Sequence, residues 1–165
     1  MILRSFNNIE KTENGYIIHG DAADVLLVFM TDDIFRFRVS FARNFKEESY
    51  TLVHTAWADR MDALLGDERE RLPALDMPVT EEEKALCFET KSLRLVVNKE
   101  PFFFKVYDKA GTCIYSDLAE RAFEVDQLGR LSHYSKMDRE GDHFYGFGEK
   151  TGYLDKKGRR LRMSP

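Results

Sequence analysis

Residues 34–41 alternate between apolar and polar side chains with a period of two, a pattern that sorts side chains onto opposite faces only in an extended strand. The apolar face would carry Phe35, Phe37, Val39 and Phe41, and the polar face Arg36, Arg38 and Ser40. The apolar run Val25–Met30 precedes this segment across Thr31–Asp33, which has the composition of a turn. The pattern predicts an antiparallel hairpin with one buried face and one solvent-facing side.

Other short segments with strand character lie at close spacing along the chain. They are Gly15–Gly20, Ala85–Thr90, Leu93–Val97, Phe102–Tyr107, Thr112–Tyr115, Phe123–Val125 and Leu131–Tyr134, with Asp142–Glu149 as the last strand. About ten such strands predict an all-β fold, an antiparallel β-sandwich. The segment Trp57–Leu72 differs, because its apolar residues recur at spacings of three, four and seven, which predicts a short amphipathic helical insert.

Length, charge and hydrophobicity limit the number of domains and the kinds of partner that we expect for this chain. A chain of 165 residues corresponds to one domain, residues 1–165. The net charge of −4, with both signs mixed, argues against nucleic acid as a partner. We find no apolar run long enough for a membrane span and no signal peptide, so we expect a cytoplasmic protein without membrane contact.

Cysteine and histidine usage suggests no redox or metal chemistry. Cys87 and Cys113 lie in apolar, strand-like segments and are interpreted as buried free thiols, with a disulfide between them left open. The four histidines are scattered without the spacing of metal ligands. We therefore expect neither a metal nor a cofactor.

The segment with the most distinctive motif is Tyr145-Gly146-Phe147-Gly148-Glu149. Aromatic residues alternate with glycines, which in a strand let another backbone or ring approach closely. This run resembles the Tyr-Gly-x-Gly-Glu signature of glycoside hydrolase family 31, the family of α-glucosidases and α-xylosidases. In that family the signature lies near the end of an N-terminal β-sandwich.

The resemblance extends over most of the chain as an ordered pattern of apolar alternation, a Pro-Phe pair and an Asp-x-x-Gly turn. Its members are Thr90, Leu93, Leu95, Val97, Pro101, Phe102, Phe104, Val106, Asp108 and Gly111. It implies a galactose-mutarotase-like sandwich that packs against a (β/α)8 barrel. It also favours a strand at Ala85–Thr90, although Thr80–Glu83 has the pattern of a helix capping box.

The resemblance places the catalytic aspartates of the family in the barrel, which this chain does not contain. Retaining glycosidases need two carboxyl groups about 5 Å apart, and no such pair can be assigned here. We therefore expect a non-catalytic N-terminal domain, inactive alone, that braces the barrel of the same polypeptide and leads into a loop at the sugar pocket. The parent enzyme would bind an α-linked oligosaccharide, and the isolated domain would self-associate through its uncovered face.

Two alternatives remain open from the sequence. One is an autonomous carbohydrate-binding sandwich. The other is a mutarotase-like enzyme, which would need a paired histidine and carboxylate on the concave face of the sandwich.

The candidate site residues are those of the family motif, Tyr145, Gly146, Gly148 and Glu149, and their expected role is structural. Glu149 is expected to accept backbone N–H groups or an arginine and so to hold the loop that follows. The alternative for Glu149 is a sugar contact or a catalytic acid. Residues 156–162 place five cations in seven positions and are expected to form a solvated loop rather than a nucleic-acid patch.

Overall fold

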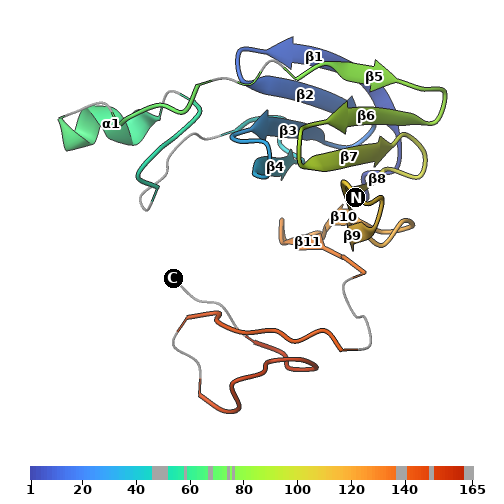
Figure 1. Cartoon of the computed structure of the whole chain (residues 1–165). Coiled ribbons are helices and arrows are strands. Elements are labelled where there is room, and N and C mark those ends of the chain that lie inside the picture. The colour runs from blue at the N-terminus through green and yellow to red at the C-terminus, as the bar shows by residue number, and fades with distance from the viewer. Residues whose placement is uncertain are drawn as a thin grey trace. The chain divides into compact units, whose positions relative to one another are not determined.

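The computed structural model describes residues 1–45, 52–57, 59–66, 69–73, 75, 77–136, 141–148 and 151–161. The chain divides into two compact units, Met1–Ser135 and Lys136–Pro165. Eleven strands and one helix are assigned within the described residues, all of them in the first unit (Figure 1). The second unit is held by turns and side-chain hydrogen bonds.

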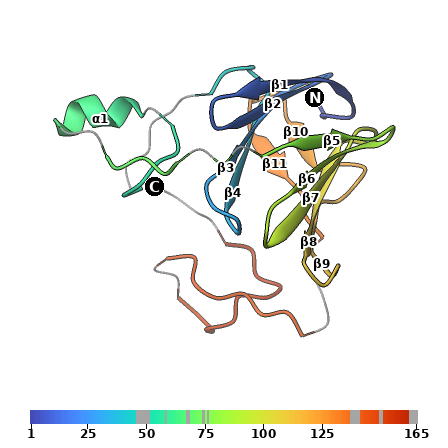
Figure 2. The same ribbon diagram turned by 45° about the horizontal axis from the view of Figure 1, so that its top comes forward.

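The first unit is an antiparallel β-sandwich, as predicted. Its four-stranded sheet has the order β1-β2-β3-β4, and its five-stranded sheet the order β5-β6-β7-β8-β9. A separate pair, β10-β11, completes the unit (Figure 2). The strands of the first sheet are β1 Phe6–Thr12, β2 Gly15–Gly20, β3 Asp24–Phe29 and β4 Phe35–Ser40. Those of the second are β5 Val79–Glu81, β6 Ala85–Glu89, β7 Leu93–Asn98, β8 Phe103–Asp108 and β9 Cys113–Ser116, and the pair is β10 Phe123–Val125 and β11 Leu131–His133.

Aromatic side chains join the two sheets across the core. The Phe88 ring of β6 lies 5.6 Å from the Phe29 ring and 5.3 Å from the Tyr16 ring, between centroids. Further along, the Phe37 ring of β4 lies 4.2 Å from the Phe104 ring of β8. Burial of such large side chains supplies most of the driving force for folding. The alternating apolar residues of β4 are half-buried and pack against this core, on the side that the alternation predicts.

The structure corrects the prediction that the polar side of the hairpin faces solvent. The Arg36 guanidinium lies 4.0 Å from the centroid of the Trp57 ring. Ala56, Trp57 and Leu72 pack on the outward side chains of β3, and Trp57 is itself buried. The outward side chains of β3, with Arg36 of β4, are thus covered by residues from the region 56–72. A two-residue alternation cannot reveal this, because the covering side chains come from a different part of the chain.

The helical insert is shorter than the predicted region. Helix α1 spans Arg60–Leu65 and begins at Asp59, whose carboxylate accepts the Met61 N–H. It ends at Gly66, which has a φ of 79°. Arg69 then bonds Asp62 at 2.8 Å and lies 3.2 Å from Asp59. Strand β6, Ala85–Glu89, forms as expected from the resemblance. Strand β5, Val79–Glu81, was not predicted and lies where the capping-box pattern indicated a helix start.

The strand prediction also differs from the structure at both ends of the chain. Strand β1 was not predicted, because Phe6–Thr12 is mostly polar and half exposed and owes its extended conformation to pairing with β2. The last strand, predicted at Asp142–Glu149, is absent over the described residues 142–148. Gly146, Phe147 and Gly148 all have positive φ values there, which a strand cannot accommodate.

Cys87 and Cys113 are free thiols, half-buried rather than fully buried. Burial, together with Glu82, raises the pKa of the Cys87 thiol, which keeps it protonated and poorly nucleophilic. Among the described residues, no helix has the length and apolar character that crossing a membrane requires.

Candidate functional site

The second unit is organised around the carboxylate of Asp155. One oxygen, Oδ1, accepts the N–H groups of Phe144 at 3.0 Å and Lys157 at 2.9 Å, and Oδ2 is 2.7 Å from His143 Nδ1. The Lys156 N–H donates to the Phe144 carbonyl at 2.7 Å. The bond from His143, with the two backbone N–H groups, holds the pKa of Asp155 well below its usual range. Asp155 thereby ties the two halves of the segment 141–161 together.

The role expected of Glu149 is performed by Asp155 within the described residues. Glu149 itself lies outside them. The sequence offers one signal for Asp155, namely a single acidic residue placed just before the run of cations. That signal does not reveal that its partners lie eleven and twelve residues earlier in the chain.

Lys156 corrects the expectation of a wholly solvated basic loop. Its side chain is buried, and Nζ donates to the carbonyl of Tyr153 and, at 3.4 Å, to that of Thr151. A buried ammonium group surrounded by carbonyl oxygens is a structural element that closes a turn. Arg159 and Arg160, by contrast, are exposed.

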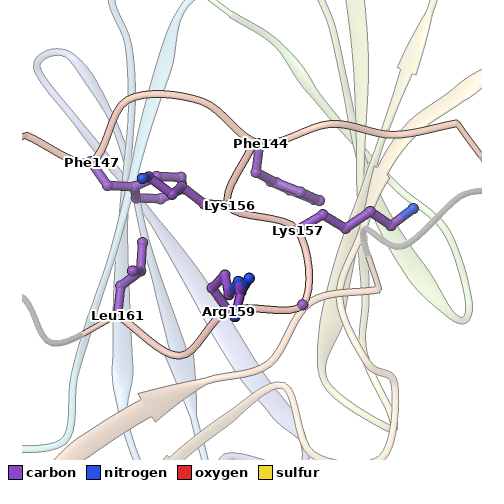
Figure 3. A pocket seen from close by; sticks show the side chains of 7 residues that line it. Phe144, Phe147, Lys156, Lys157, Arg159 and Leu161 are labelled. Carbon is purple, nitrogen blue, oxygen red and sulfur yellow. The ribbon is translucent and has the colours of Figure 1, made fainter. Parts of the chain in front are cut away.

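The second unit contains a pocket of about 330 Å³. It is lined by Phe144, Phe147, Lys156, Lys157, Gly158, Arg159 and Leu161. Figure 3 shows Phe147 and Leu161 on one side of the pocket, and Phe144 and Lys157 on the other. Apolar walls with cationic groups at the rim suit an occupant that combines apolar surface with negative charge.

The other motif residues occupy the turn that leads into this pocket. Tyr145 is exposed, with its ring 6.1 Å from the His143 ring. Gly146 and Gly148 have φ values of 90° and 71°. A Cβ placed on either glycine meets no atom of the described chain within 4 Å, so no close approach is seen among the described residues. These glycines are needed for their backbone conformation.

We expect Gly148→Val to loosen this turn because of backbone strain rather than a steric clash. A branched residue at positive φ costs about 1–2 kcal/mol. Gly148→Asn should be tolerated much better, since asparagine adopts the left-handed region readily. Hydrogen exchange of residues 141–148 in the two variants would decide the matter. Equal loosening by both variants would show that space, not φ, is limiting.

A paired histidine and carboxylate does exist in the first unit, although no partner for His133 was evident from the sequence. His133 Nε2 lies 2.7 Å from Asp117 Oδ1, which also accepts the Tyr115 hydroxyl at 2.8 Å. The other oxygen, Oδ2, accepts the Phe104 N–H at 2.9 Å. Both oxygens are therefore engaged within the fold, and the Asp117 side chain is 0% exposed. This arrangement joins strands β8, β9 and β11 and commits both carboxylate oxygens to groups of the fold.

Comparison with known proteins identifies the chain. The pattern of the glycosyl hydrolase 31 N-terminal galactose mutarotase-like domain matches residues 24–164. The chain belongs to this family. Alpha-glucosidase 2 of Bacillus thermoamyloliquefaciens is 29% identical to this galactose-mutarotase-like domain over 159 residues, which are 96% of the chain and 18% of that protein.

Solved structures show the same fold. The domain superposes on a family 31 dextranase of Flavobacterium johnsoniae with a TM-score of 0.76 and 24% identity, covering 96% of this chain and 18% of that one. A family 31 alpha-xylosidase of Xanthomonas citri gives a TM-score of 0.61 and 18% identity, covering 91% and 16%. The galactose-mutarotase-like domain thus spans less than a fifth of the length of these relatives.

Proposed function

We propose that this domain is the N-terminal part of a retaining α-glycosidase of the α-glucosidase type, in which it performs no chemistry. Its role is to brace the catalytic barrel and to hold the segment 141–161 that leads toward the sugar pocket. The observation that carries the proposal is the family match over residues 24–164, supported by a relative named as an alpha-glucosidase.

The buried carboxylates support a non-catalytic role, because each of them forms a hydrogen bond or ion pair with another group of the chain. Asp24 accepts from Arg43 and His19, Asp59 and Asp62 share Arg69, and Asp117 is fully bonded as described above. A retaining glycosidase needs one carboxylate free to attack the sugar and one carboxyl group free to donate a proton. Each of these four is instead bonded to other groups of the fold, and the one buried oxygen without a hydrogen-bond partner, Asp62 Oδ2, belongs to a carboxylate that Arg69 holds.

We predict that the 165-residue chain has no glycosidase activity. The measurement is turnover of an aryl α-glucoside by the purified chain, with the full-length protein as the positive control. Turnover that persists in the chain after a second purification step would contradict the assignment of the chemistry to the barrel.

The substrate of the parent enzyme is proposed as a terminal α-linked glucoside in an oligosaccharide. The relatives are named as an alpha-glucosidase, a dextranase and an alpha-xylosidase, so the family includes several specificities. A panel of aryl α-glucoside, isomaltotriose and aryl α-xyloside, given to the full-length protein, tests the proposal. Preference for the xyloside would overturn it. Cytoplasmic location, and self-association of the isolated domain, remain predictions.

A further inference from the structure

Another pocket lies in the first unit, between the β1–β2 hairpin and the segment that precedes β5. We call it the hairpin pocket. Its volume is about 280 Å³, and it is lined by Lys11, Thr12, Glu13, Gly15, Tyr16, Leu75 and Met77. Pockets for drug-sized ligands usually measure about 300–1,000 Å³. The hairpin pocket therefore suits a smaller ligand, of the size of one ring.

The walls of the hairpin pocket are held in place by the fold. The Tyr16 hydroxyl donates to the Met77 carbonyl at 2.5 Å and joins the two sides of the pocket. Asn14, in the hairpin turn, donates from Nδ2 to the Ala56 carbonyl. Tyr16 and Met77 are buried, and Leu75 packs against the core. A pocket that is already ordered loses little conformational entropy on binding, which favours even a small ligand.

The polar side chains of the hairpin pocket all come from the hairpin. Within the part of the chain that the structure describes, the Thr12 hydroxyl and the Glu13 carboxylate have no side-chain hydrogen bond or ion pair. Lys11 lines the same side of the pocket and carries a charge opposite to that of Glu13. Because the two charges offset each other, the pocket favours a neutral ligand over a cation or an anion. The hydroxyl and the carboxylate can both accept hydrogen bonds from the hydroxyl groups of such a ligand.

We propose that the hairpin pocket binds one ring of a neutral carbohydrate. A pyranose ring has hydroxyl groups around its edge and C–H groups on its faces, so it needs hydrogen-bonding groups and apolar surface together. Thr12 and Glu13 supply the first, and Leu75 and Met77 supply the second. The choice of an α-linked glucose oligosaccharide as the ligand rests on the proposed function. Under that function, a sugar chain held at this pocket has a raised effective concentration for the rest of the enzyme.

The test is a titration of the 165-residue chain with isomaltotriose, followed by hydrogen exchange. Under the proposed function the catalytic carboxylates lie outside this chain, so binding by the chain reports only sites of its own. We expect protection of residues 11–16 and of the Leu75 and Met77 amides, which reaches saturation as the sugar concentration rises. Sorbitol, a linear polyol without a ring, should compete poorly.

Two substitutions on the hairpin test the contacts. Glu13→Gln should weaken the binding about tenfold and Thr12→Val about threefold, because a hydrogen bond to a charged group contributes more than one between neutral groups. The matched control is Glu120→Gln, which changes an exposed carboxylate that does not line the pocket and should bind as the parent chain does. Leu75→Ala, which removes apolar surface from the opposite side, should also weaken the binding.

Several results would overturn the proposal. One is the lack of saturable protection at isomaltotriose concentrations up to about 50 mM, which reaches beyond millimolar affinity. Another is equal affinity of the Glu13→Gln and Glu120→Gln variants. Protection confined to residues 144–161 would assign sugar binding to the pocket of the second unit, and equal competition by sorbitol would show that no ring is recognised. The proposed function is tested separately: a full-length protein that binds isomaltotriose at the hairpin but cleaves no α-glycoside would refute the activity and leave the pocket standing, and cleavage without binding at the hairpin would do the reverse.

Discussion

Asp117→Ala should destabilise the sandwich by about 3–5 kcal/mol, the largest effect we expect from one substitution. The change removes the buried acceptor of three bonds. It leaves the Phe104 N–H without its acceptor, and the Tyr115 hydroxyl and His133 Nε2, which lie 3.1 Å apart, retain only each other. Each buried donor left without a partner costs about 1–3 kcal/mol. Since domains are stable by about 5–15 kcal/mol, much of the margin would be lost. Urea unfolding followed by circular dichroism measures the change.

The control is Glu89→Ala, which removes an exposed carboxylate that lies 3.3 Å from Lys109 and should leave the unfolding midpoint nearly unchanged. Asp117→Asn separates shape from charge, because the amide keeps the size and one acceptor. If Asp117→Ala unfolded at the same urea concentration as the parent chain, the three bonds would be dispensable. The histidine–carboxylate pair would then have to be reconsidered as a site retained for chemistry.

If the proposed function holds, Asp155→Ala should reduce turnover by the full-length protein on the order of a hundredfold, as misplacement of a positioned segment can do. The substitution removes the acceptor of the Phe144, Lys157 and His143 bonds, so only the Lys156 N–H bond to the Phe144 carbonyl is left of the hydrogen bonds described above, and the two halves of the segment 141–161 should loosen. The sandwich should remain folded, because Asp155 belongs to the second unit. Kinetics of the full-length protein, with hydrogen exchange of residues 141–161, measure both effects. Lost turnover with unchanged exchange would make Asp155 a direct participant in the reaction.

The same carboxylate gives the segment a defined dependence on pH. The folded pKa of Asp155 lies below the unfolded value of about 4. The carboxylate therefore favours the ordered segment fully above about pH 5, and this contribution is lost as the pH falls through 4 toward the folded pKa. Order in the segment should be constant at neutral pH and fall in acid. Asp155→Asn should flatten that dependence, and a profile identical to that of the parent chain would assign it to other groups.

The strands were predictable wherever their own residues carry the pattern. Gly15–Gly20 and Phe123–Val125 have the predicted limits, and the alternation at 34–41 correctly places Phe35 and Phe37 in the core. These predictions succeed because the period of two is a local property of the backbone. Strand β1 was missed for the same reason, since its mostly polar residues become a strand only by pairing with β2.

The motif at 145–149 correctly identified the family, and the positive φ values explain its glycines. That this segment leads to the sugar pocket stays a prediction. The residue that organises the segment is Asp155, which the motif does not include.

The sequence by itself determined the fold class, the order of most strands and the family. Periodicity and ordered motifs depend on residues that are close together in the sequence, so they can be recognised without the structure. Only the tertiary structure decided that Trp57 covers Arg36, that Asp117 joins three strands and that Asp155 closes the segment 141–161. Each of these depends on groups brought together by the path of the chain rather than by spacing alone. A carboxylate in a sequence carries no sign of which donors will surround it, and those donors decide whether it is buried structure, exposed charge or chemistry.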